Sequence, residues 1–133
     1  MPSVFFDSNV LLYAAADEGK KRARVEALIR ANGTISVQVL SEIASVARRK
    51  MRMDWDETVE FVAAFRNWLH VIPLTEQIHD DGIRLARRYQ LSVYDGMIVA
   101  AAIDADCTVL YSEDMQNGMI VDSKLRIQNP FLS

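Results

Sequence analysis

Short hydrophobic runs alternate with longer amphipathic segments along the whole chain. The short runs are rich in Val, Ile, Leu and Phe and lie between polar or turn-forming residues, which predicts β-strands. The longer segments repeat apolar residues at spacings of three and four, the pattern of an amphipathic helix. We expect strands at 3–6, 34–36, 70–72, 108–111, 119–121 and 125–127, and helices at 10–16, 20–31, 38–50, 55–68, 75–89 and 92–105.

Three of the predicted helices carry further signals. The segment 92–105 is apolar almost all round, which predicts a central, buried helix. Asp54 and Glu57 have the spacing of a capping box, so we expect the helix at 55–68 to begin directly after Asp54. The inward-facing residues predicted for the segment 20–31 are Ala23, Ala27, Leu28 and Ala31.

This order of elements predicts an α/β fold with a mainly parallel sheet and helices on both faces. The length of 133 residues fits one domain, and we expect residues 1–133 to form it. In such sheets, functional sites form beyond the carboxyl ends of the strands, where the strand order reverses. Polar residues that follow a strand are therefore the first candidates for a site.

The overall charge argues mildly against a nucleic-acid partner. The chain has 15 basic and 18 acidic side chains, a formal net charge of −3. The four acidic residues proposed below as a site account for this excess, because without them 15 basic and 14 acidic side chains remain. Basic residues also cluster, and each cluster is either a phosphate-binding surface or a solvated helix face. The clusters are Lys20, Lys21, Arg22 and Arg24; Arg48, Arg49, Lys50 and Arg52; and Arg84, Arg87 and Arg88.

Cysteine content and hydropathy indicate the compartment. Cys107 is the only cysteine, which fits a reducing environment because a single thiol forms no internal disulfide. The longest apolar run, 97–103, is far shorter than the ~20 residues that a membrane span needs. We therefore expect a cytoplasmic protein without a membrane partner.

Two acidic residues follow predicted strands. Asp7 comes directly after the strand at 3–6, and Asp114 follows the strand at 108–111 through Ser112 and Glu113. The structural alternative is a helix N-cap for Asp7 and a turn residue for Asp114.

Two further acidic residues border apolar helix faces. Glu42 lies three residues after Val39 and four residues before Val46, so it borders the apolar stripe of its helix. Asp95 lies in the first turn of the most apolar helix, three residues after Ser92. The structural alternative for Glu42 is a boundary residue whose carboxylate lies in water. For Asp95 it is a first-turn residue that complements the helix cap and the helix dipole.

In a parallel α/β domain these four carboxylates can converge at one end of the sheet. Converging carboxylates repel and raise one another's pKa unless a cation compensates. Mg²⁺ prefers oxygen ligands and needs no histidine or cysteine. The sequence therefore predicts a metal site formed by Asp7, Glu42, Asp95 and Asp114.

The residues around these acids resemble the motifs of PIN-domain ribonucleases. The matching segments are 5–13 (FFDSNVLLY), 37–42 (VQVLSE), 91–102 (LSVYDGMIVAAA) and 110–115 (LYSEDM), and they occur in the family's order. Size and motif style are most similar to the VapC-type toxins of toxin–antitoxin pairs. One departure is Gly96, where the resemblance leads us to expect alanine after the third acidic residue.

The resemblance implies a PIN-like three-layer sandwich with a mostly parallel, five-stranded sheet flanked by helices. It also implies RNA cleavage dependent on Mg²⁺ or Mn²⁺, a homodimer, and inhibition by a small cognate antitoxin. Asp7, Glu42, Asp95 and Asp114 carry over as the acidic cluster, and Ser112 occupies the family's hydroxyl position. Supporting candidates are Ser8 and Asn9.

Two other functions fit parts of the pattern. A catalytically silent relative could bind RNA or a protein partner without cutting, although retention of all four acidic residues argues against this. A receiver-type phosphotransferase domain would need paired acids at the first strand and a lysine after a late strand. Only Asp7 follows the first strand, and no lysine is suitably placed.

Overall fold

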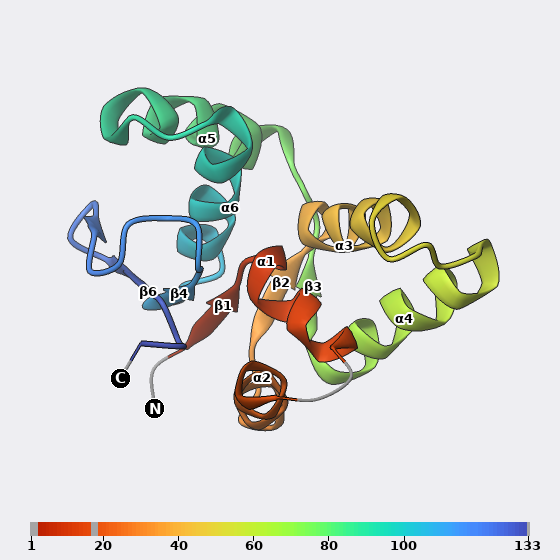
Figure 1. Ribbon diagram of the computed structural model, residues 1–133. Coiled ribbons are helices and arrows are strands. Elements are labelled where there is room, and N and C mark those ends of the chain that lie inside the picture. Colours follow the sequence, from red (N-terminus) through yellow and green to blue (C-terminus); the bar gives the residue numbers. More distant parts are fainter. Residues whose placement is uncertain (1–2, 17–18, 133) are drawn as a thin grey trace.

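A computed structural model describes residues 3–16 and 19–132. Its centre is a six-stranded sheet with the order β3-β2-β1-β4-β6-β5 (Figure 1). Neighbouring strands are parallel except for β5, which pairs with β6 in the antiparallel sense. The strands are β1 (Val4–Phe6), β2 (Thr34–Ser36), β3 (His70–Ile72), β4 (Val109–Tyr111), β5 (Ile120–Val121) and β6 (Leu125–Gln128).

The helices form two layers, one on each face of the sheet. The chain moves outward from β1 to β2 to β3 and then returns to β4 on the other side of β1. Because parallel crossovers are right-handed, this reversal places the last two helices on the face opposite the earlier ones. The helical segments are α1 (Ser8–Leu11), the 3₁₀ helix η1 (Leu12–Ala15), α2 (Lys20–Arg30), α3 (Val37–Arg49), α4 (Trp55–Trp68), α5 (Glu76–Tyr89) and α6 (Val93–Asp104).

This topology confirms the predicted α/β architecture with a mostly parallel sheet. The strand order reverses between β1 and β4, which lie side by side, so a site is expected beyond their carboxyl ends. The resemblance implied five strands, whereas the structure has six. The additional strand is the two-residue β5, which forms a short hairpin with β6, as the hydrophobic run at 119–121 indicated.

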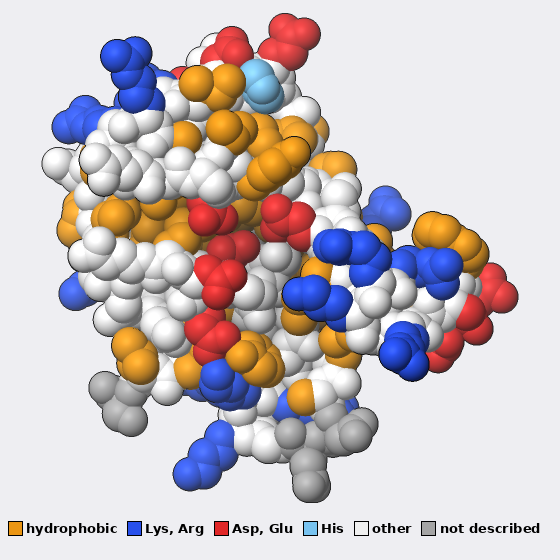
Figure 2. Space-filling model, turned by 45° about the horizontal axis from the view of Figure 1, so that its top comes forward, with side chains coloured by type: hydrophobic (Ala, Val, Ile, Leu, Met, Phe, Trp, Pro, Cys, Tyr) orange, Lys and Arg blue, Asp and Glu red, His pale blue; other side chains and the backbone are white. Residues whose placement is uncertain are grey.

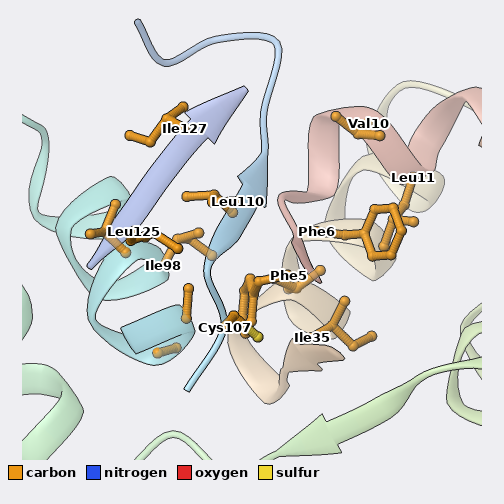
Figure 3. Close-up of a cluster of buried hydrophobic side chains, with 14 of the residues drawn as sticks. Phe5, Phe6, Val10, Leu11, Ile35, Ile98, Cys107, Leu110, Leu125 and Ile127 are labelled. Atoms are coloured by element: carbon orange, nitrogen blue, oxygen red, sulfur yellow. The ribbon is translucent and has the colours of Figure 1, made fainter. Parts of the chain in front are cut away.

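The core lies between the sheet and both helical layers. Phe5 and Phe6 of β1 point to opposite faces and are fully buried, as successive residues of a strand must be when both faces are covered. Figure 3 shows Leu110 near Ile98 of α6, on one side of this core. The apolar helix at 92–105 is therefore central, as predicted, because seven consecutive residues of α6 are buried.

Side-chain caps fix where several helices begin. The capping box at Asp54 and Glu57 is present, as predicted from their spacing. The hydroxyls of Ser36, Thr75 and Ser92 each accept a hydrogen bond from the backbone N–H three residues later, at the starts of α3, α5 and α6. No helix within 3–16 and 19–132 is long and apolar enough to cross a membrane.

Two local predictions were wrong. The segment 10–16 is not one helix, because Asp7 caps a turn of α-helix that starts at Ser8 and continues as η1. In α2 the buried residues are Val25 and Ile29, while the three predicted alanines are exposed. The branched side chains bury more apolar area than alanine, and this decides which face of a charged helix packs inward.

Candidate functional site

Asp7 and Ser112 occupy the carboxyl ends of the two central strands. The backbone N–H of Asp7 donates to the carbonyl of Tyr111, which continues the pairing of β1 with β4 by one residue. This places the Ser112 hydroxyl 2.8 Å from Asp7 Oδ2, to which it donates a hydrogen bond. Asp7 Oδ1 accepts from the Ser8 backbone N–H at 2.8 Å. Asp7 is thus both a helix cap and a residue at the carboxyl ends of the two central strands.

Glu42 reaches the same end of the sheet from α3. The Ser8 hydroxyl donates to Glu42 Oε1 at 2.8 Å, and Gln38 Nε2 donates to Glu42 Oε2 at 3.1 Å. Gln38 Nε2 also donates to the backbone carbonyl of Tyr94 at 3.0 Å. These contacts join α1, α3 and the first turn of α6, and they hold the Glu42 carboxylate in one orientation.

Asp95 and Asp114 complete the group. Asp95 is half-buried in the first turn of α6, and its backbone N–H donates to the Ser92 hydroxyl at 3.1 Å. Burial raises the pKa of Asp95, and the negative charges of Glu42 and Asp114 add to the increase. Asp114 is exposed in the loop after β4. Charge interactions therefore link Asp95 to Glu42 and Asp114, and interactions of the same kind link Asp7 to Glu42 and Asp95.

Asp7 carries the largest perturbation. It is 4 % exposed, and burial raises its pKa to about 7. The hydrogen bond from Ser112 works against this increase, while the charges of Glu42 and Asp95 contribute to it.

None of the four carboxylates forms an ion pair within the described residues. Figure 2 shows Asp and Glu side chains gathered in the middle of one face.

The chemistry of these donors fits a hard divalent cation. Within 3–16 and 19–132, no three carboxyl, imidazole or thiol groups converge closely enough to enclose an ion by themselves. Mg²⁺ tolerates this spacing, because it usually keeps several waters and takes one or two carboxylates directly. A divalent ion would also supply the positive charge that the buried Asp7 carboxylate needs in order to ionise at neutral pH.

The neighbouring Glu113 differs from the four acids of the cluster, because its negative charge is paired with Lys21. Lys21 Nζ donates to Glu113 Oε2 at 2.6 Å, and this contact lowers the pKa of Glu113. The Tyr13 hydroxyl donates to Glu113 Oε1 at 2.7 Å. Asn9 connects this group to the cluster, because its side chain donates to Asp7 and accepts from the Glu113 backbone N–H. The supporting candidates Ser8 and Asn9 thus both contact cluster residues.

Gln38 also contacts the cluster, although no local sequence pattern indicated it. Its side chain is 7 % exposed, and Oε1 is buried without a hydrogen-bond partner in the described part of the chain. Its position four residues before Glu42 places it on the same face of the helix. A buried glutamine aimed at a carboxylate is a positioning group for that carboxylate.

Comparisons with known proteins identify solved structures of the same fold. The chain is similar to a Klebsiella pneumoniae protein in a toxin–antitoxin complex (17 % identity, TM-score 0.73, 97 % of this chain and 98 % of that one). It is also similar to Mycobacterium tuberculosis VapC20, a sarcin–ricin loop cleaving toxin (18 % identity, TM-score 0.68, 84 % of this chain and 90 % of that one). A third similar structure is that of DNA-bound VapBC from Salmonella typhimurium (19 % identity, TM-score 0.67, 98 % of this chain and 99 % of that one).

These likenesses concern the fold, because all three identities are low. Among curated proteins, no sequence matches the chain. The family comparison, in contrast, covers most of the sequence, since the PIN domain family matches residues 4–116. This match contains β1, β4 and all four acidic residues of the cluster, and it establishes that the chain belongs to the PIN domain family.

Proposed function

We propose that this protein is a metal-dependent ribonuclease and the toxin of a type II toxin–antitoxin pair. The observation that carries the proposal is the cluster of four carboxylates at the switch point of a PIN-domain sheet, none of which has a cationic partner among the residues that the structure describes. The neighbours support it, since one is a toxin that cleaves the sarcin–ricin loop and others come from toxin–antitoxin complexes. We further propose a single-domain, cytoplasmic homodimer that binds a small cognate antitoxin.

The reaction we propose is hydrolysis of an RNA phosphodiester bond. Mg²⁺, or Mn²⁺ in its place, would polarise the scissile phosphate and lower the pKa of a water molecule. Asp7, Glu42 and Asp95 would hold the ion directly or through water, and Asp114 would orient the attacking water. Ser112 would keep the Asp7 carboxylate in place through its hydrogen bond. The products would carry a 5′-phosphate and a 3′-hydroxyl.

The test is cleavage of purified RNA by the purified protein. We expect cutting with Mg²⁺ or Mn²⁺, no cutting in EDTA, and recovery when Mg²⁺ is added in excess over the chelator. Cleavage that continues in EDTA would contradict the metal assignment. Protein that binds RNA or an antitoxin but never cuts with either metal would instead support a catalytically silent regulator.

The role of Gln38 leads to a separate prediction. Gln38→Met keeps the size of the side chain but removes the hydrogen bonds to Glu42 and to the Tyr94 carbonyl. Groups that orient metal ligands typically contribute 10–100-fold, so we expect kcat to fall by about that factor. The Mg²⁺ concentration for half-maximal activity should rise, while KM for RNA should not change.

The control for this prediction is Gln77→Met, at an exposed position of α5. It should retain wild-type kcat and the wild-type Mg²⁺ requirement. A Gln38→Met protein with an unchanged Mg²⁺ requirement and a lower melting temperature would assign Gln38 to packing alone.

A further inference from the structure

Positive charge without an acidic partner gathers at the C-terminal end of α3. Three of the four side chains there are exposed, and none of the four forms an ion pair within the described residues. By contrast, Lys21 and Arg84 are paired with acids. We call this group the basic end of α3. It consists of Arg48, Arg49, Lys50 and Arg52.

An exposed tryptophan lies against this group. Trp55, the first residue of α4, is 67 % exposed. The Arg48 guanidinium lies 4.1 Å from the centre of the Trp55 ring and donates to the carbonyl of Met53 at 2.7 Å. Arg48 therefore holds the indole in place while much of its surface remains open. Aromatic rings beside unpaired cations are what proteins use to stack bases of single-stranded nucleic acid.

Arg49, at the basic end of α3, lies on the same helix face as Glu42 of the acidic cluster. Arg49 follows Glu42 by seven residues, which is two turns, or about 10 Å, along the helix. Ser45 lies between them, and its hydroxyl accepts a hydrogen bond from Arg49 Nε at 3.0 Å. Figure 2 agrees, since Lys and Arg side chains lie beside the acidic group on the side of α3. One strand of RNA can therefore contact both regions.

We propose that the basic end of α3 and Trp55 bind the single-stranded RNA that flanks the cleaved bond. Arg49, Lys50 and Arg52 contact phosphates, and a base stacks on the open part of Trp55. The exposed acids Asp56 and Glu60 of α4 repel phosphates, so the strand passes over the end of α3 and not along α4. This inference rests on the proposed function, because it adds a substrate-binding surface to the same site.

The first test measures RNA affinity in EDTA, so that cleavage does not enter the result. The probe is a fluorescent single-stranded RNA of mixed sequence and about 16 nucleotides, followed by anisotropy over a range of salt concentrations. The triple variant Arg49→Gln, Lys50→Gln, Arg52→Gln should bind about 10- to 100-fold more weakly at low salt. Its slope of log affinity against log salt should be about 2 smaller, since each single-strand phosphate contact contributes about 0.7.

The matched control changes charge by the same amount elsewhere on the surface. It is Arg66→Gln, Arg87→Gln, Lys124→Gln, at three exposed positions. The control should keep an affinity within a few-fold of wild type and an unchanged slope. Equal affinity and slope in the two triple variants would overturn the proposal, as would loss of antitoxin binding without loss of RNA affinity.

The second test concerns stacking on Trp55. In a Trp68→Phe background Trp55 is the only tryptophan, and RNA should quench its fluorescence. Trp55→Ala should weaken RNA binding by about 5- to 100-fold, the usual range for one stacked base. Emission that does not respond to bound RNA would overturn the stacking. Wild-type protein that binds RNA through the basic end but does not cut would contradict the proposed function and leave this inference standing.

Discussion

The Asp7→Asn variant should lose about 10³-fold of the ribonuclease activity and, without metal, become more stable at neutral pH. The activity loss follows from removal of a proposed metal ligand, because a bound divalent ion supplies several kcal/mol to the transition state. The stability gain follows from the burial of Asp7. Opposite effects on activity and stability are expected of a residue retained for chemistry and not for the fold.

The sign of the stability change follows from the pKa of Asp7. Burial raises it from 3.8 to about 7, so the folded state favours the protonated carboxyl. An acid of this kind lowers stability as the pH rises from about 4 to about 7, by about 4 kcal/mol in all at 1.36 kcal/mol per pH unit. Asparagine has no charge to bury. The substitution nevertheless lowers the free energy of unfolding by about 1 kcal/mol, because the asparagine NH₂ cannot accept the hydrogen bonds that Asp7 Oδ2 receives.

The two stability curves should therefore cross. In EDTA, Asp7→Asn should be more stable than wild type by about 3 kcal/mol near pH 8 and less stable by about 1 kcal/mol near pH 4. Urea unfolding at a series of pH values measures this difference. Added Mg²⁺ should stabilise the wild type more than the variant, since an ion that binds the folded state raises its stability.

A control separates burial from general charge removal. Asp104→Asn, at an exposed position at the C-terminal end of α6, should leave activity and the pH dependence of stability unchanged. An Asp7→Asn protein that cuts RNA at the wild-type rate would remove Asp7 from the site. Parallel stability curves would contradict the assigned burial of its charge.

Local sequence patterns predicted the elements and which of their ends lie side by side. The strand before Asp7 and the strand before Ser112 were visible as short hydrophobic runs, and a parallel sheet necessarily places their carboxyl ends at one edge. Glu42 was identifiable because it borders an apolar stripe. The predictions of strands and helices held because their periodicities depend on near neighbours in the chain, whereas the assignment of Glu42 to a site stays a prediction.

Contacts between elements were not predictable in the same way. The hydrogen bond from Ser8 to Glu42 joins α1 to α3, and no pattern within either segment specifies which side chains meet. Gln38 had the spacing to reach Glu42, but exposed glutamines often have this spacing too. Its burial depends on the first turn of α6 lying against α3, which only the packed structure shows.

Gly96 is another residue that only packing explains. The resemblance led us to expect alanine there, and glycine in a helix costs about 0.5–1 kcal/mol relative to alanine. A Cβ at Gly96 would collide with the carbonyl oxygen of Gly82 and lie 2.9 Å from Ala86 Cβ. A Cβ at Gly82 would in turn lie 2.8 Å from Met97 Cα. The two glycines allow the backbones of α5 and α6 to approach closely.

Gly96→Ala should therefore destabilise the protein, although alanine is the better helix former. We expect a loss of about 3 kcal/mol, at the upper end of the range for overpacking, because the obstructing atom belongs to a rigid helix backbone. The midpoint of urea unfolding should fall with an unchanged slope. If α6 moves to relieve the collision, the adjacent Asp95 moves with it, and RNA cleavage should decrease as well.

The reverse substitution at an open position provides the control. Ala63→Gly, on the exposed face of α4, should cost about 1 kcal/mol through helix propensity alone. The two substitutions exchange the same residues in opposite directions, so propensity alone would make Gly96→Ala stabilising. Destabilisation by both shows that close packing of α5 on α6 outweighs propensity. A more stable Gly96→Ala protein would show that the two helices can separate at little cost, and that the position of Asp95 does not depend on this contact.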